Sequence, residues 1–319
     1  MRKDKGSAKS LTERAIISEI SRILGERLDD DCAYIKIGDT YLALTIDSIS
    51  EVSHVPKGAS PEDIGWFAST VSLSDLASSG ADPEILLLSI VAPRNRRILI
   101  PRIVKGANDC ARAYSARIVG GDTKEGARLV LTSVGVGRMP RPVTRSGARP
   151  GDSIYLTGAI GKCAAGYHDR NKARGAKKVL RISPRCALAG FMRVHASACI
   201  DLSDGLVTSL YHLADASNCK MQVDLSRAPI DDDLTRIIKR VEPREQLRIA
   251  ANFGGDYELL FTSSDRISGS AEGVRVTKMG RVASGAGVVD EMGRGIPDEG
   301  YEHFSDRWIG LVGKGRTAH

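Results

Sequence analysis

Aromatic residues are scarce in this chain: Phe, Tyr and Trp together make up 5% of its 319 residues. Proteins that hold single-stranded nucleic acid stack its bases on aromatic side chains, so such a surface is poorly supplied here. The net charge of +7 suits either a nucleic acid or a small anionic substrate. Because the sequence also shows no basic recognition helix, we expect the small anion and no nucleic-acid partner.

Long apolar runs are missing as well. No stretch reaches the roughly 18–20 apolar residues that a membrane-spanning helix needs. The first residues, Met1–Gly6, lack the apolar segment of a signal peptide. We therefore expect a cytoplasmic protein with no membrane partner.

Metal-site patterns built on sulfur and imidazole are also absent. The six cysteines form no C-x-x-C pair and the six histidines no pair four residues apart, so no zinc or iron site is expected and the thiols are expected to be free and buried. The chain has no G-x-x-x-x-G-K-[ST] loop, and no G-x-G-x-x-G turn follows a strand. Any nucleotide site must therefore use another device.

Helical and extended patterns mix along the chain without a strict βαβ rhythm, which indicates an α+β fold. The expected helices cover residues 11–25, 60–79, 98–114, 159–170, 184–195, 203–216 and 230–251. The expected strands cover residues 32–37, 41–46, 85–92, 117–119, 128–136, 153–156, 198–200, 220–225, 257–262 and 273–282. The segment 140–150 contains three prolines and has the composition of a linker. It divides the chain into an N-terminal domain, 1–140, and a C-terminal α+β domain, 141–319.

What the chain does contain is aspartate at the ends of extended runs and near helix starts. The clusters are Asp29–Asp31, Thr45–Asp47, Ser74–Asp75, Gly120–Thr123, Asp201–Gly205 and Gly254–Asp256. Carboxylates at turns, beside Gly, Ser and Thr, suit hard divalent cations, and Mg²⁺ is usually bound by a few carboxylates together with substrate phosphates. The pattern predicts a Mg²⁺-dependent nucleotide enzyme.

Each cluster also has an ordinary explanation. Asp47 fits a strand-end cap, and Gly120–Thr123 fits a plain turn as well as a phosphate-binding loop. Ser203 is expected either to cap the following helix or to hold a phosphate, which leaves Asp201 unexplained. Asp75 is expected in the last turns of its helix, where an acid opposes the helix dipole, and this placement favours a functional role.

His54 and Arg145 lie in segments expected to be loops. A single histidine in such a place is ordinarily an exposed surface residue. A linker arginine is ordinarily solvated, although its guanidinium has the geometry to bind phosphate with two hydrogen bonds.

In their order and spacing these segments resemble the thiamine-monophosphate kinase family, whose superfamily includes aminoimidazole ribonucleotide synthetase, selenophosphate synthetase and a hydrogenase-maturation dehydratase. The resemblance extends over about residues 11–305. The matching stretches are Asp30–Ala33, Thr45–His54, Val71–Ala77, Gly80–Pro83, Gly120–Thr123, Thr144–Asp152, Asp201–Leu206, Gly254–Leu259 and Gly300–Phe304. Of these, TRSGARPGD and DYEL favour this family over its relatives.

The resemblance implies transfer of the γ-phosphoryl group of ATP to thiamine monophosphate, several Mg²⁺ ions, and a homodimer whose N-terminal domains pair into a shared β-barrel. Because the acceptor is already an anion, the reaction needs charge neutralisation and in-line alignment rather than a general base. The implied metal-binding residues are Asp30, Asp31, Thr45, Ile46, Asp47, Asp75, Asp122, Asp201 and Asp204. The implied ATP contacts are Gly121, Asp122, Arg145 and Ser203, and the implied substrate contacts are His54, Gly255 and Asp256.

The chain departs from the family pattern on the acceptor side. Gly255 stands where a glutamate that contacts the thiamine moiety is usual, and Pro297–Glu299 stand where an aromatic residue is usual. The alternative is therefore a related ATP-dependent enzyme of the same superfamily with a different acceptor. A non-catalytic nucleotide-binding regulator is a further alternative, against which the retained acids argue.

Overall fold

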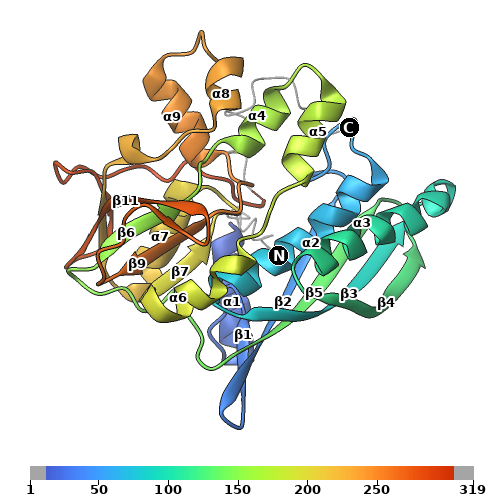
Figure 1. Ribbon diagram of the computed structural model, residues 1–319, viewed down its shortest axis with the longest axis horizontal. Coiled ribbons are helices and arrows are strands. Elements are labelled where there is room, and N and C mark those ends of the chain that lie inside the picture. The colour runs from blue at the N-terminus through green and yellow to red at the C-terminus, as the bar shows by residue number, and fades with distance from the viewer. Residues whose placement is uncertain (1–11, 305–319) are drawn as a thin grey trace, which may run out of the picture.

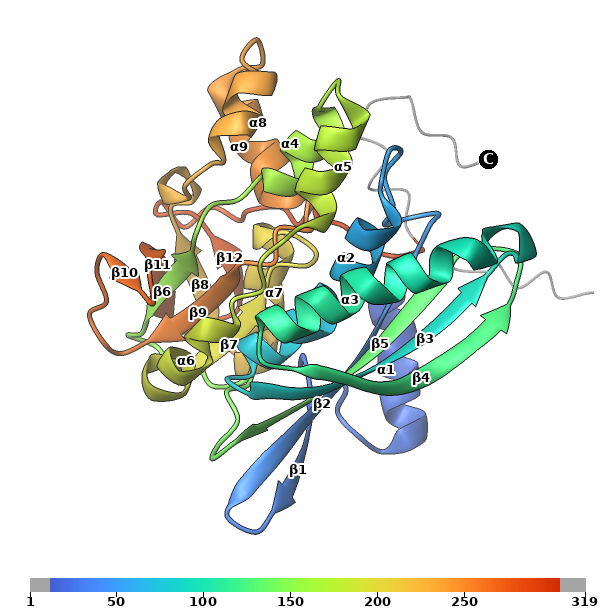
Figure 2. The same ribbon diagram turned by 45° about the vertical axis from the view of Figure 1, so that its right-hand side comes forward.

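The computed structural model describes residues 12–304, and its N-terminal half is built on a five-stranded sheet in the order β1-β2-β5-β3-β4. The strands are β1 (Ala33–Ile37), β2 (Thr40–Ser50), β3 (Asp82–Ala92), β4 (Arg117–Glu125) and β5 (Val130–Met139). Strands β3 and β4 are parallel and the other neighbours antiparallel. Helices α2 (Pro61–Ser78) and α3 (Ile100–Ala113) lie side by side on one face of this sheet, and η1 (Arg94–Leu99) leads into α3 (Figures 1 and 2).

The C-terminal half contains a seven-stranded sheet in the order β12-β8-β11-β6-β9-β7, with β10 beside β11. Its strands are β6 (Ser153–Thr157), β7 (Ala198–Asp201), β8 (Lys220–Val223), β9 (Leu259–Ser263), β10 (Ser270–Ala271), β11 (Val274–Ala283) and β12 (Gly287–Val289). Its helices are α4 (Lys162–His168), α5 (Lys172–Leu180), α6 (Ala189–His195), α7 (Leu206–Ser217), α8 (Asp232–Ile237) and α9 (Pro243–Asn252), with short 3₁₀ turns η2 (Cys186–Leu188) and η3 (Leu225–Arg227). The expected α+β class is confirmed.

Local sequence signals set the helix ends where they are strong. Helix α1 (Glu13–Leu24) begins after Thr12, whose hydroxyl accepts the Ala15 N–H, and it ends at Gly25 in the left-handed conformation. Helix α2 begins with Ser60 as its cap and Pro61 in its first turn, as predicted.

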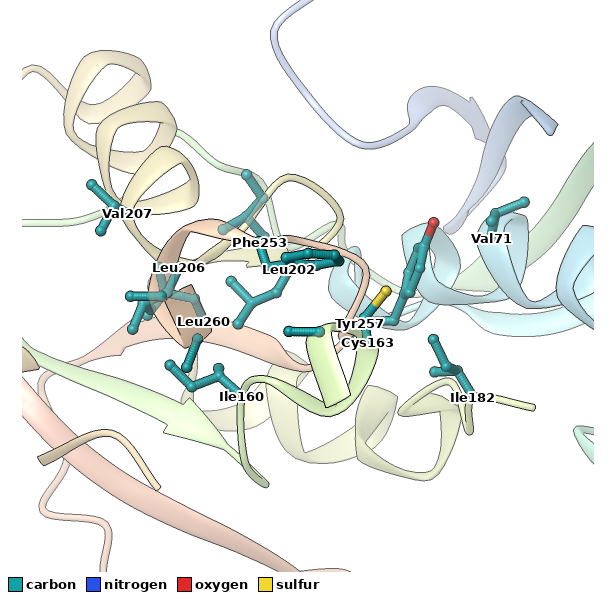
Figure 3. Packing of buried hydrophobic residues seen from close by; sticks show 14 of the residues in the cluster. Val71, Ile160, Cys163, Ile182, Leu202, Leu206, Val207, Phe253, Tyr257 and Leu260 are labelled. Atoms are coloured by element: carbon teal, nitrogen blue, oxygen red, sulfur yellow. The ribbon is translucent and has the colours of Figure 1, made fainter. Parts of the chain in front are cut away.

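One hydrophobic core runs through both halves. It joins Ile49 and Phe67 of the N-terminal half to Ile154 and Leu260 of the second sheet, and Figure 3 shows Val71 of α2 beside Tyr257. The segment predicted to be a linker is packed rather than loose. The Val143 N–H donates to the Ser79 carbonyl over 3.0 Å, and the Thr144 carbonyl accepts the Cys199 N–H over 3.1 Å. The domain boundary at 140 remains a prediction.

Within residues 12–304 no helix combines the length and apolarity needed to cross a bilayer. The cysteines are free, as expected, and all are buried except Cys186, which is half-buried.

Several predicted element boundaries are wrong. Strand β2 continues to Ser50 because it pairs with β5 along its whole length, so Asp47 lies inside a strand rather than at its end. Residues 120–123 lie in β4 rather than in a loop. A Cβ at Gly121 would lie 1.8 Å from the Leu88 carbonyl oxygen, so this glycine permits close strand contact.

Helix α7 also begins later than predicted. Its cap position is Gly205, in a backbone conformation with φ of 104°, and no side chain caps the helix, so the predicted capping role of Ser203 is wrong. The helices expected over 159–170, 184–195 and 230–251 are each shorter or interrupted. Helix α5 contains Lys172, Arg174, Lys177 and Lys178, and Arg174 pairs with Asp169.

Candidate active site

Three carboxylates from distant parts of the chain converge between the two sheets. Asp31 precedes β1, Asp75 lies in α2 and Asp201 ends β7, and each offers an oxygen within 4.8 Å of the other two. Asp201 is buried and the Asp31 side chain is 2% exposed. Three acids this close repel one another strongly in a low-dielectric site, so the arrangement favours a cation.

Hydroxyl groups orient these carboxylates. Ser74 Oγ donates to Asp201 Oδ2 over 2.6 Å, and Ser78 Oγ donates to Asp31 Oδ2. Thr45 of β2 donates to Asp75 Oδ2. Sequence reasoning missed Ser78 as a site residue. Its position three residues after Asp75, and four after Ser74, is the helical spacing that would have indicated it.

Arg145 is the cation within this group. Its Nε donates to Asp31 Oδ1 over 2.9 Å, Nη2 donates to the same oxygen, and its backbone N–H lies 3.4 Å from Asp30 Oδ1. Nη1 lies 3.4 Å from His212 Nδ1. Burial, followed by the charge of Arg145, lowers the pKa of His212 to about 3, so this ring is neutral. The Arg145 side chain is 19% exposed, so its interpretation as a solvated linker residue is wrong.

Burial raises the pKa of the surrounding aspartates. The pKa of Asp75 is raised well above its usual value by burial and then by the charges of Asp201, Asp47 and Asp31. Burial, with Glu13 as the next cause, raises the pKa of Asp204 to about 7. Burial likewise raises the pKa of Asp47 to about 6. Burial is thus the main cause of each shift, and for Asp75 and Asp204 the charges of neighbouring acids add to it.

The pKa of Asp30 is also raised, to about 6. Burial is the larger cause and the charge of Asp31 the second. The Asp30 carboxylate accepts hydrogen bonds from the Asp31 N–H and, over 3.2 Å, from the Tyr34 hydroxyl. It therefore lies one step outside the three converging carboxylates.

A cavity of about 230 Å³ is lined by Val71, one helical turn before Asp75, and by residues of β2 and of the segment that follows Asp201. Several predicted site residues line it, namely Asp47, His54, Ser203, Asp204 and Gly255. Glu13, Tyr257 and His303, which the sequence did not single out, also line it. Asp47 connects the cavity to the three carboxylates because it lines the wall and also raises the pKa of Asp75.

His54 presents a neutral ring to this cavity. The Ser50 N–H donates to Nδ1 over 3.2 Å, so the proton of the neutral imidazole lies on Nε2. Burial, followed by the charge of His303, lowers the pKa of His54 to about 4. The side chain is half-buried, so the interpretation as an exposed surface histidine is wrong.

Three predicted site residues, Gly121, Asp122 and Asp256, neither line the cavity nor belong to the three converging carboxylates. Asp122 is on edge strand β4, three strand spacings or about 14 Å from Asp47, and the sheet register assigns it to the opposite face. Gly121 is beside it, at the same sheet edge. The Ile46 side chain also points to that opposite face and is 70% exposed, so only its backbone, between Thr45 and Asp47, lies near the site, and its metal-binding role remains a prediction. Asp256 accepts the N–H groups of Gly161 and Cys163 over 2.7 and 2.9 Å at the start of α4.

Comparisons with known proteins identify the family. Residues 29–139 match the family model for the N-terminal domain of AIR synthase related proteins. Thiamine-monophosphate kinase of Halobacterium salinarum is 34% identical over 92% of this chain and 100% of its own length. The Escherichia coli enzyme of that name is 34% identical over 89% of this chain and 95% of its own length.

Solved structures with the same fold include members of this family and of a related one. The complex of AaThiL with AMPPCP and TMP superposes with a TM-score of 0.85 at 28% identity, covering 95% of this chain and 99% of that one. Escherichia coli HypE, a hydrogenase maturation protein, shares the fold at 20% identity with a TM-score of 0.62, over 81% of this chain and 86% of that one. With the fold, the acidic site and the curated relatives in agreement, the chain belongs to the thiamine-monophosphate kinase family.

Proposed function

We propose that this chain transfers the γ-phosphoryl group of ATP to the phosphate of thiamine monophosphate, forming ADP and thiamine diphosphate. The observation that carries the proposal is the convergence of Asp31, Asp75 and Asp201 beside a cavity of about 230 Å³, in a chain of this family. The curated relatives are named for this activity, and the structural neighbour was solved with AMPPCP and TMP.

The donor set fits Mg²⁺. Its groups are hard oxygens, with Asp31, Asp75 and Asp201 as the central candidate ligands, and Asp47 and Asp204 on the cavity wall. Burial, followed by the charges of neighbouring acids, raises the pKa of Asp75 and of Asp201, and a bound cation would offset both effects. Bound Mg²⁺ would neutralise phosphate oxygens and polarise the phosphoryl group that is transferred.

The protein groups then position the acceptor. Neutral His54 directs an Nε2–H donor at an anion and takes no proton from it. The loop at Gly254 and Gly255, with φ of 78° and 77°, brings backbone rather than side chains to the cavity wall. Arg145 fixes Asp31, so the carboxylates keep their orientation when the phosphates arrive.

The lack of space for a side chain at Gly255 favours a second candidate acceptor. A Cβ there would lie 2.7 Å from Cys163 Sγ, so Cys163 occupies space that a larger side chain would need. The acceptor pocket therefore differs from one with a glutamate at this position. A related phosphate-bearing acceptor, handled by the same Mg²⁺ and ATP chemistry, is the alternative function.

We also propose a homodimer in which the uncovered faces of the two N-terminal sheets meet. Large apolar side chains on β1, β2, β3 and β4 are exposed, namely Ile35, Ile37, Ile46, Leu87 and Val119. A second copy would cover them. Asp122 lies on this uncovered face, about 14 Å from Asp47 of the same chain. We therefore propose that Gly121 and Asp122 contribute to the site of the other chain.

Turnover of the purified protein tests the proposed reaction. With Mg²⁺ and ATP, we expect ADP formation that depends on thiamine monophosphate and matches thiamine diphosphate mole for mole. The Asp75→Asn variant is the matched control for contaminating kinases. Binding of Mg²⁺ and ATP without thiamine diphosphate formation would reject this acceptor and support the alternative one.

A further inference from the structure

Tyr257 has a backbone conformation that bulky residues rarely adopt. Its φ is 53°, in the left-handed region. Three hydrogen bonds impose this conformation. The Tyr257 N–H donates to the Leu202 carbonyl, the Leu202 N–H to the Glu258 carbonyl and the Gly255 N–H to the Ser203 carbonyl. Strain that the surrounding structure enforces in this way is concentrated at functional sites, so the side chain that it positions needs an explanation.

The strained backbone directs the Tyr257 side chain into the interior. The residue is 6% exposed, and its ring meets the edge of Phe67 with centroids 5.6 Å apart. Figure 3 shows its hydroxyl pointing toward α2 beside Val71, one helical turn before Asp75. The residue also lines the cavity described above.

The hydroxyl of Tyr257 has no hydrogen-bond partner among residues 12–304, in contrast to the buried Tyr155. Tyr155 donates to the Asp265 carbonyl over 2.9 Å and accepts the Ile267 N–H over 3.1 Å. Because Tyr257 lines the cavity, a hydroxyl that bonds no described residue is available to donate to an acceptor oxygen of a ligand bound there.

The charges of four acids act on this hydroxyl. Burial raises the pKa of Tyr257 well above its usual value, and the charges of Asp47, Asp201, Asp204 and Asp75 raise it further. The group therefore remains a neutral O–H donor. The Tyr257 hydroxyl is thus a hydrogen-bond donor close to carboxylates, in the wall of the cavity where phosphates would bind.

We propose that Tyr257 is a catalytic residue of the proposed kinase reaction and that its hydroxyl donates a hydrogen bond to a non-bridging oxygen of the acceptor phosphate. The inference rests on the proposed function. An acceptor oxygen forms the new bond to the γ-phosphorus while the bond from this phosphorus to the β–γ bridging oxygen breaks, and ADP leaves. Tyr257 keeps its proton throughout and holds the acceptor phosphate in line.

The test compares Tyr257→Phe with Tyr155→Phe. Tyr257→Phe keeps the ring and the packing on Phe67 and removes only the hydroxyl. We expect its kcat/KM for thiamine monophosphate to fall on the order of 10²-fold, as when one preorganised donor is lost. Calorimetric titration should show acceptor affinity about tenfold weaker, because a charge-assisted hydrogen bond is lost. Affinity for AMPPCP with Mg²⁺, and the Tm, should be unchanged.

Tyr155→Phe should keep the wild-type kcat/KM and acceptor affinity. Unchanged acceptor affinity and turnover in Tyr257→Phe would overturn the inference. A fall in its Tm together with equal losses of nucleotide and acceptor binding would also overturn it, because the hydroxyl would then be structural. Failure of the wild-type protein to phosphorylate thiamine monophosphate would reject the proposed function instead, while the affinity comparison would still measure the hydrogen bond.

Discussion

Arg145 and Asp31, which are 114 positions apart in the chain, are joined by hydrogen bonds from the guanidinium to a single carboxylate oxygen, with Nε 2.9 Å from Oδ1. This pair connects the segment between β5 and β6, which contains Arg145, to Asp31, which precedes β1. It leaves Asp31 Oδ2 to the Ser78 hydroxyl. Arg145 thus supplies a fixed positive charge to Asp31, next to the acids Asp75 and Asp201.

Replacing Arg145 should destabilise the metal-free protein. In Arg145→Ala the Asp31 carboxylate loses its buried partner, a change that typically costs about 3 kcal/mol in the free energy of unfolding. Saturating Mg²⁺ should recover part of this loss, because the ion takes over the neutralisation of Asp31. Urea denaturation with and without Mg²⁺ measures both values.

The matched control is Arg94→Ala, which breaks the exposed pair with Glu125 and should change the free energy of unfolding by less than about 1 kcal/mol. Equal losses in the two variants would contradict the special position of Arg145.

Metal-free protein should lose stability as the pH rises from about 4 to 7. The folded-state pKa values of Asp47 and Asp204 are raised to about 6 and 7, and that of Asp75 is raised well above its usual value. At these acids the folded state binds more protons than the unfolded state in this window, so their contribution to stability falls with increasing pH. The lowered pKa values of His54 and His212 act in the opposite direction, but the acids with raised pKa values, which also include Asp30 and Asp201, outnumber them. Mg²⁺ displaces those protons, so its stabilising effect should increase over the same range.

Thermal unfolding at pH 5 and pH 8, with chelator or with Mg²⁺, measures this dependence. Asp75→Asn should flatten the metal-free profile, because it removes one carboxylate whose pKa is raised. A metal-free Tm that rises from pH 5 to pH 8 would refute the electrostatic description of the site.

The sequence predicted most of this site because the family resemblance and the acidic turns point to the same residues. Asp31, Asp75 and Asp201 do converge, although no local pattern relates them. Ser78 and Tyr257 escaped prediction. Ser78 is indicated only by its helical spacing from Ser74 and Asp75, and the left-handed backbone of Tyr257 arises from hydrogen bonds to a distant loop.

The fold was predicted best where signals are local. The start of α2 is an example, because Ser60 and Pro61 determine it within one turn. Strand β4 was missed over 120–125 because its glycines resemble a turn, whereas pairing with β3 determines their conformation. Tertiary pairing of this kind is not encoded in a short window of sequence.

His54 should matter for the acceptor more than for ATP. Its neutral Nε2–H lines the cavity, so His54→Ala should raise KM for thiamine monophosphate by roughly tenfold, the effect of one hydrogen bond to a charged group. The KM for ATP should change little. Because the pKa of His54 is about 4, its contribution should be constant from pH 6 to pH 8.

Steady-state kinetics at several pH values tests this expectation, with His195→Ala as the control. His195 pairs with Asp265 and does not line the cavity. Equal increases in both KM values for His54→Ala would remove this residue from the acceptor site.

Mixed dimers should reveal whether Asp122 acts across the subunit interface. Asp47→Asn and Asp122→Asn should each inactivate the protein with little change in Tm, because each removes charge without disturbing the core. If Asp122 serves the other chain's site, a mixed dimer of the two variants contains one site with both aspartates intact. Random reassociation would then restore about a quarter of wild-type activity. If each chain uses its own Asp122, no mixed site is intact, and the mixture should be as inactive as either variant alone.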